Sequence, residues 1–222
     1  MIGLDKGLVK FDWKDIEDLS DSEITYFLSL EGKPIEAICK IRRIQREEVQ
    51  RHIIEGKIKY RFLVKSKSEE ELFITLCNTP KQDKLSVLAS LINESREKLI
   101  EYIKKQFANM QSKDKETALW IIGELKTKAA MDILMKSIVH KHVNIRRMAV
   151  SALGKLEDNA GEIALLRALE DENSQVVMYA IKSLAKIKSE RALIKVKSIY
   201  ATAEKDYLKR AAEEFMSSFV QQ

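Results

Sequence analysis

The sequence predicts an all-α fold in which short helical hairpins stack side by side into an α-solenoid. The first observation is a period of 31 residues in the second half of the chain, where alanine and then a large apolar residue recur in register. The second is composition, because 45% of the 222 residues are apolar while glycine occurs seven times and proline twice. A hairpin of two short helices cannot bury its apolar face alone, so neighbouring hairpins are expected to share one continuous core.

The first helix of each repeat is marked by two columns of positions four residues apart. Residues i and i+4 lie on one face of a helix, so these columns should pack between neighbouring repeats. The columns contain Ala118, Ala149, Ala180 and Ala211, and then Ile122, Leu153, Leu184 and Phe215. The second helix of each repeat is equally regular, with Leu134, Leu165 and Val196 in one column and Ile138, Leu169 and Tyr200 in another.

The solenoid is expected to span residues 81–222. One period before the clear repeats, the same columns contain Val87, Leu91, Ile103 and Phe107, which predicts a degenerate first unit near 81–111. Residues 208–219 supply only a first helix, so the last of about five units is partial, as terminal units of such arrays often are.

One unit shows a pattern of its own. Residues 144–154 read NIRRMAVSALG, and a helix expected over 163–169 is followed by Asp171. This unit resembles a HEAT repeat of the short bacterial type, and its neighbours keep only the core columns. The resemblance covers about half of the chain. It implies a binding protein, because HEAT solenoids hold proteins or nucleic acids along their inner surface, and it leaves the partner open.

Residues 1–67 are expected to form a separate small helix-turn-helix domain. Ser20 and Glu23 fit a capping box that opens a helix ending near Gly32. Pro34 suits the first position of a second helix, and a third helix is expected to stop at Gly56. The stretch 34–53 resembles a DNA-binding helix-turn-helix, with core positions at Ala37 or Ile38, Ile41, Ile44, Val49 and Ile53.

The charge of this domain suits nucleic acid. Residues 33–67 contain eleven lysines and arginines against four glutamates, whereas the 32 residues before them contain three lysines against eight acidic residues. If the resemblance holds, duplex DNA contacts residues 33–65, because arginine can pair with guanine and glutamine with adenine in the major groove. The candidate DNA-binding residues are Arg43, Gln45, Arg46, Gln50, Arg51, Lys57, Lys59 and Arg61.

Residues 57–65 alternate basic and apolar side chains with the period of a strand. We expect this strand to pair with residues 8–11 as the wing of a winged helix-turn-helix. Two interpretations stay open. The basic side chains contact phosphates, or they protect a solvated strand edge against aggregation.

Residues 68–80 are expected to join the two domains and to include a short helix. Residues 79–82 read TPKQ, a second capping box that predicts the start of the next helix. Within the solenoid, Lys105, Lys136 and Arg167 share one position on successive second helices. This basic ladder is a candidate surface for an acidic protein or a phosphate backbone, or it is an ordinary solvated face. Trp120 is a further candidate protein-binding residue, or it covers a neighbouring part of the fold.

The sequence contains no recognisable catalytic motif, glycine-rich phosphate loop or paired cysteine motif, so no enzyme activity, cofactor, metal site or small-molecule substrate is expected. No apolar run reaches the length of a membrane span, and the first ten residues do not resemble a signal peptide. With two cysteines that are expected to stay reduced, these features favour a cytoplasmic protein.

The sequence therefore favours a non-enzymatic binding protein: a DNA-binding or regulatory adaptor in which the helix-turn-helix module contacts DNA and the solenoid holds a protein. The alternative is a pure protein-interaction scaffold without nucleic-acid binding. A remote alternative is a HEAT-like DNA glycosylase, for which Trp120, Tyr179 and Asp132 would have to form the active site.

Overall fold

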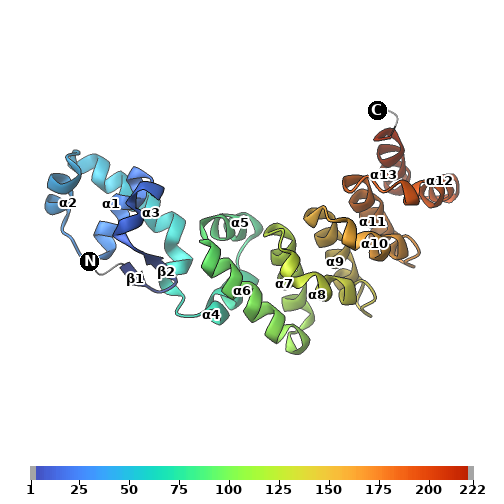
Figure 1. The fold of residues 1–222 in the computed structure, drawn as a ribbon, viewed down its shortest axis with the longest axis horizontal. Helices are drawn as coiled ribbons and strands as arrows, with labels where there is room; N and C mark the ends of the chain where they lie inside the picture. The colour runs from blue at the N-terminus through green and yellow to red at the C-terminus, as the bar shows by residue number, and fades with distance from the viewer. Residues whose placement is uncertain (1–3, 220–222) are drawn as a thin grey trace. The chain divides into compact units, whose positions relative to one another are not determined.

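The computed structural model describes the backbone of residues 4–219 and the side chains of residues 6–219. It divides into two compact units, Met1–Leu99 and Ile100–Gln222. Both units are built from helices, and unit 1 also contains one two-stranded sheet (Figure 1).

Unit 1 opens with a β-hairpin. Strand β1 (Leu4–Lys6) pairs antiparallel with β2 (Val9–Phe11), and Gly7 makes the turn with a φ of 64°. A Cβ atom at Gly7 would lie 2.5 Å from two backbone carbonyl oxygens near residue 63, so only glycine fits this turn. The backbone N–H of Leu8 donates to the carbonyl of Leu63 at 2.9 Å, which fastens the hairpin to the end of helix α3.

Three helices follow the 3-10 helix η1 (Trp13–Asp18): α1 (Asp21–Leu30), α2 (Ile35–Arg42) and α3 (Arg46–Lys65). The capping box at Ser20 and Glu23 is confirmed, since both of its hydrogen bonds are present. Pro34 precedes α2 as its N-cap and is not its first residue. The core of these helices contains Ile24, Leu28, Ile38 and Val49.

The predicted wing is wrong, because α3 continues without interruption through Gly56 to Lys65. Gly56 is buried against Tyr26, and a Cβ atom there would lie 2.1 Å from Cγ of the tyrosine. The glycine therefore serves close packing of α1 on α3 and does not end the helix. Helical periodicity buries Tyr60 and Leu63 on the face that also contains Val49. The expected partner strand, β2, pairs with β1 instead.

Two more sequence expectations in this unit need correction. Ile41, expected in the core, is 55% exposed, because it lies on the outer face at the end of α2. Helix α5 (Lys81–Ser90) begins where expected, but it has no capping box: Pro80 is its N-cap, and the hydroxyl of Thr79 donates to the carbonyl of Thr75. The junction helix is α4 (Glu69–Cys77), and α3 packs against both α4 and α5.

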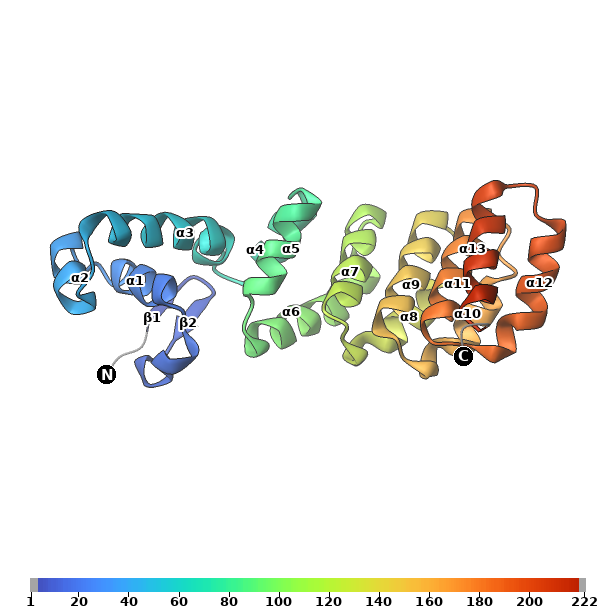
Figure 2. The same cartoon turned by 90° about the horizontal axis from the view of Figure 1, so that it is seen from above.

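Unit 2 is a stack of helical hairpins. Its first helices are α7 (Ser112–Glu124), α9 (Val143–Leu156), α11 (Ser174–Lys186) and α13 (Asp206–Ser217), and each packs against the next (Figure 2). Its second helices are α8 (Met131–Ser137), α10 (Glu162–Ala168) and α12 (Leu193–Thr202). Helix α6 (Asn93–Gln106) and the 3-10 turn η2 (Phe107–Asn109) precede these hairpins.

The predicted core columns are confirmed. The four alanines of the first column are at most 1% exposed, and so are the four large residues of the second column. Small residues allow the first helices to approach closely: a Cβ atom at Gly154 would lie 2.1 Å from Oγ of Ser183 on α11. Tyr200 departs from its column, since it is 37% exposed and donates its hydroxyl to Glu213 on α13.

The connections inside the hairpins also repeat. Lys126, Glu157 and Lys188 have φ angles of 49°, 53° and 51°, and 31 residues separate each from the next. Each ends a first helix in the left-handed conformation that glycine usually adopts. A short 3-10 turn then leads into each second helix: η3 (Lys128–Ala130), η4 (Asn159–Gly161) and η5 (Glu190–Ala192).

Candidate functional site

The second helices of unit 2 leave an unusual set of side chains in solvent. Val139, Ile163 and Ile194 are 55%, 68% and 85% exposed. Ile163 and Ile194 occupy the same position of successive repeats, at the starts of α10 and α12. We call the set formed by Lys136, Val139, Ile163, Arg167 and Ile194 the second-helix surface. Its aliphatic members lie on exposed faces where a soluble helix normally presents polar residues.

The bases of the predicted ladder are available on this surface. Lys136 and Arg167 are exposed, as is Lys105 on α6, and none of the three makes an ion pair or side-chain hydrogen bond with another described residue. Arg167 follows Ile163 by four residues, so both lie on one face of α10. The surface therefore combines aliphatic side chains with positive charges that form no ion pair with a described carboxylate.

A cavity of about 400 Å³ lies beside this surface, and its lining includes Val139, Arg167 and the buried Arg146. Arg146 forms a two-point ion pair with Asp171, with Nε–Oδ2 and Nη2–Oδ1 distances of 2.7 and 2.9 Å. Its Nη1 donates to the carbonyl oxygens of His140 and Lys141. Such a bidentate pair holds the start of α9 and the connection before it against the connection between α10 and α11, and it gives the cavity a fixed wall.

Trp120 lies on α7, which is a first helix, and is half-buried. The ammonium of Lys155 on α9 lies 6.0 Å from the centre of its ring, and Lys155 also pairs with Glu124 at 2.6 Å. Trp120 therefore contacts the neighbouring repeat and does not belong to the second-helix surface.

The candidate DNA-binding residues of unit 1 divide into two groups. Four of the bases are held by carboxylates: Arg46 by Glu36 at 2.6 Å, Arg51 by Glu55 at 3.0 Å and by Glu48 at 3.5 Å, Lys59 by Glu23 at 2.8 Å, and Arg61 by Asp83 at 2.7 Å. The remaining residues are exposed, and their side chains make no hydrogen bond or ion pair with a described residue: Arg43, Gln45, Gln50 and Lys57.

These residues do not form one basic face. Arg46, Gln50 and Lys57 are four and seven residues apart, so they share one side of α3. Lys59 lies on another side, where it reaches α1. Arg43 has a φ of 55° in the turn before α3, a conformation in which glycine is more usual. The helix-turn-helix interface that the sequence suggested is therefore not supported.

None of the residues named for the glycosylase alternative lines the cavity beside the second-helix surface. Trp120, Asp132 and Tyr179 lie on α7, α8 and α11. Within residues 4–219, no group of three or more histidine, cysteine or acidic side chains is placed to hold a metal ion. No helix of this part of the chain is both long and apolar enough to cross a membrane.

The sequence predicts the basic ladder but not the exposed aliphatic residues of the second-helix surface. The 31-residue spacing of Ile163 and Ile194 was visible. Only the structure shows that this column faces solvent, because a short helix with several apolar residues does not reveal which of them is buried.

Comparison with known proteins identifies the repeats. Residues 96–167 and 160–217 match the family model of HEAT repeats, which together is more than half of the chain. The crystal structure of an engineered protein aligns over 91% of this chain and 98% of its own, with 14% sequence identity and a TM-score of 0.48. No curated protein matches the sequence.

Proposed function

Because the chain belongs to the HEAT-repeat family, we propose that it is a non-enzymatic scaffold that holds an acidic protein partner on the second-helix surface of unit 2. The observation that supports this most is the exposure of Ile163 and Ile194 at one repeat position, on the same set of second helices as Lys136 and Arg167, which pair with no described residue. Protein interfaces combine apolar anchors with a charged rim. Cys39 and Cys77 are not joined by a disulfide, which fits the reducing cytoplasm where we place this scaffold.

The two kinds of side chain contribute differently to such a contact. Burying an exposed isoleucine contributes about 1.5–3 kcal/mol, so Ile163 and Ile194 would supply much of the affinity. The bases would steer an acidic partner toward the surface and set its orientation, because complementary charges act mainly on association and specificity. In the part of the chain that the structure describes, the ladder bases need not break an existing ion pair before they bind.

The proposal is tested with random peptides displayed on phage and selected on the full chain. We expect the enriched peptides to be acidic and to contain aliphatic or aromatic residues. The variant Lys105→Glu, Lys136→Glu, Arg167→Glu should weaken binding of the best peptide by about tenfold or more, as the loss of three charge contacts allows. Binding is measured by fluorescence anisotropy with the synthesised peptide.

A matched control reverses three exposed bases on first helices whose side chains pair with no described residue: Lys182→Glu, Lys186→Glu and Lys209→Glu. It has the same change of net charge and should bind the peptide within about twofold of wild type, since distant exposed charges are screened. Both variants should keep the wild-type melting temperature. Equal weakening in both, or selected peptides without acidic residues, would contradict the proposal.

A DNA-binding adaptor is the second candidate, favoured by the exposed and unpaired Arg43, Gln45, Gln50 and Lys57 at the start and along one side of α3. Against it, four candidate bases already pair with carboxylates. A gel shift of the full chain with random duplex at two salt concentrations decides between the candidates. Phosphate contacts make log affinity fall with log salt with a slope of about 0.9 per contact. If no salt-sensitive shift is seen, the DNA-binding candidate is rejected and the protein scaffold is the remaining proposal.

A further inference from the structure

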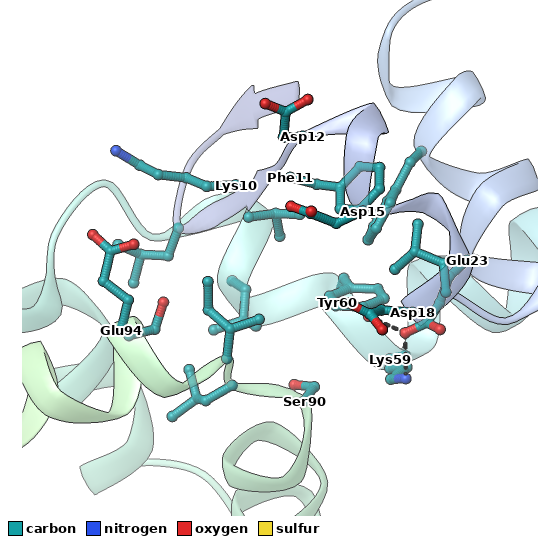
Figure 3. Close-up of a pocket in the computed structure, with 18 of the residues that line it drawn as sticks. Lys10, Phe11, Asp12, Asp15, Asp18, Glu23, Lys59, Tyr60, Ser90 and Glu94 are labelled. Atoms are coloured by element: carbon teal, nitrogen blue, oxygen red, sulfur yellow. Dashed lines mark hydrogen bonds and ion pairs between the residues drawn. The ribbon is translucent and has the colours of Figure 1, made fainter. Parts of the chain in front are cut away.

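Unit 1 contains a cavity of about 690 Å³ that the sequence did not predict (Figure 3). It is lined by side chains from β2, η1, α1 and α3 and from the segment between α5 and α6. Its apolar floor includes Val9, Phe27, Leu63 and Leu91, each at most 5% exposed. The volume lies within the range of small-molecule sites, which typically combine an apolar floor with a few polar groups.

The charges around the cavity are mostly negative. Its lining contains five carboxylates and two lysines: Asp12, Asp15, Asp18, Glu23 and Glu94, and Lys10 and Lys59. Several of these groups are already engaged. Lys59 pairs with Glu23 at 2.8 Å, Glu94 pairs with Lys98 at 2.5 Å, and Asp12 accepts a hydrogen bond from the backbone of Lys14.

Two carboxylates remain uncommitted. Asp15 and Asp18 are exposed on η1, and neither makes an ion pair or side-chain hydrogen bond with another described residue. Figure 3 shows both aspartates among the labelled residues that line the cavity, together with Phe11 and Tyr60. Aromatic rings and free carboxylates are the groups that recognise an organic cation, through cation–π contact and ion pairing.

The cavity lining also includes exposed apolar side chains that the apolar part of a ligand could contact. Ile92, which lines the cavity, is 49% exposed although it is a large aliphatic residue. Phe11 is half-buried and packs edge-on against Trp13, with ring centres 5.2 Å apart. A ligand body in contact with these side chains would remove apolar surface from water.

We propose that this cavity binds a small organic cation, with its ammonium or guanidinium group near Asp15 and Asp18 and its apolar body against Phe11 and Ile92. The site is independent of the proposed scaffold function, because the cavity lies entirely within the first unit. An anion is disfavoured by the five carboxylates of the lining, and a neutral apolar ligand would gain no ion pair from the two aspartates.

The test compares three probes that share a phenyl body and differ in charge: phenethylamine, phenethyl alcohol and 3-phenylpropionate. Binding to the full chain is measured by ligand-observed NMR and by isothermal titration calorimetry. We expect phenethylamine to bind about tenfold more tightly than the alcohol, as two exposed ion pairs allow. The propionate should not bind. Similar affinities for all three probes, or no binding of phenethylamine, would overturn the proposal.

Variants locate the site. Asp15→Asn with Asp18→Asn should reduce the affinity for phenethylamine to that of the alcohol. Glu17→Gln is the matched control, since Glu17 is an exposed acid on the same 3-10 helix outside the cavity lining. Ala89→Trp, at an exposed position of the lining, should obstruct the cavity and abolish binding of the amine and the alcohol. Circular dichroism checks that each variant is folded. Wild-type affinity for phenethylamine in the double aspartate variant or in Ala89→Trp would refute the site.

Discussion

At the scale of single residues, Glu23 connects more parts of unit 1 than the capping box alone suggests. Its Oε2 accepts from the backbone N–H and the hydroxyl of Ser20, at 2.9 and 2.6 Å. Its Oε1 accepts from the ammonium of Lys59 at 2.8 Å and from the hydroxyl of Tyr60 at 2.5 Å. Burial raises the pKa of Glu23, but these hydrogen bonds outweigh it and lower the pKa to about 2.

Tyr60 shows the reverse effect. Burial and its hydrogen bond to the charged Glu23 both raise the pKa of Tyr60 well above its ordinary value. The phenol therefore stays protonated, and remains a donor, at pH values where an ordinary tyrosine would ionise. The sequence predicted the cap at Glu23 but not these contacts, because residues 57–65 were expected to form a strand.

Glu23→Gln is expected to destabilise the protein by about 1–2 kcal/mol at pH 7, because hydrogen bonds to a charged acceptor become bonds to a neutral one. The folded pKa lies below the ordinary value of 4.5. The contribution of the charge is therefore present above pH 4.5 and is lost as the pH falls toward 2. Urea unfolding at pH 7, 4 and 2.5 measures it.

The difference between wild type and Glu23→Gln should shrink steadily over that acidic range. Glu17→Gln serves as the control, because Glu17 is exposed and lies outside the network. Its stability should follow wild type at each pH. A difference for Glu23→Gln that does not depend on pH would show that the loss comes from geometry and not from charge.

At the scale of elements, α3 shows where sequence reasoning succeeds and where it fails. The three helices of the small domain and their turns were predicted, because capping and turn residues act locally. The end of α3 was not, because Gly56 has two uses. It could stop a helix, or it could allow close approach of Tyr26 on another helix. The second use depends on a tertiary contact, which no local pattern contains.

The connections of unit 2 show a second limit. Their left-handed residues Lys126, Glu157 and Lys188 recur with the period of the repeat, but the sequence has no glycine there to mark them. Non-glycine residues in this conformation are strained by roughly 1 kcal/mol. The stack tolerates that strain at every hairpin, which indicates that the packing of the helices determines the turn.

Lys188→Gly is expected to stabilise the chain by up to about 1 kcal/mol, because glycine adopts the left-handed conformation without strain. The greater conformational entropy of glycine in the unfolded chain offsets part of this gain. Lys188 is exposed, and its side chain pairs with no described residue, so no contact is lost. Lys182→Gly, six residues earlier and inside α11, should instead destabilise by about 1 kcal/mol. Urea unfolding of both variants checks the opposite signs.

At the scale of the whole molecule, the repeat was the most predictable feature and the proposed binding surfaces were the least. Every hairpin of the solenoid must bury the same positions, so the core columns appear in the sequence several times over. Exposed positions have no such requirement. The cavity of unit 1 draws on five separate segments, and its lining has no period at all.

Helix α13, the last helix that the structure describes, has one apolar face and one charged face. Helix α13 buries Leu208, Ala211, Ala212 and Phe215 against α11 and α12. Its other face is exposed and charged, with Lys209, Arg210, Glu213 and Glu214 in solvent. A charged face of this kind offers no apolar surface on which a further repeat could stack.

Removal of α13, by ending the chain after Ala203, is therefore expected to expose the apolar faces of α11 and α12. The shortened protein should unfold at a lower temperature and should associate at higher concentration, because an uncapped repeat presents a surface made to bind another helix.

The milder change Phe215→Ala should cost about 3–5 kcal/mol, since this side chain is completely buried. Thermal unfolding and sedimentation velocity measure the two effects, and a chain ending at residue 219 should behave as wild type. If the shortened chain stays monomeric with an unchanged melting temperature, α13 is not the cap of the stack.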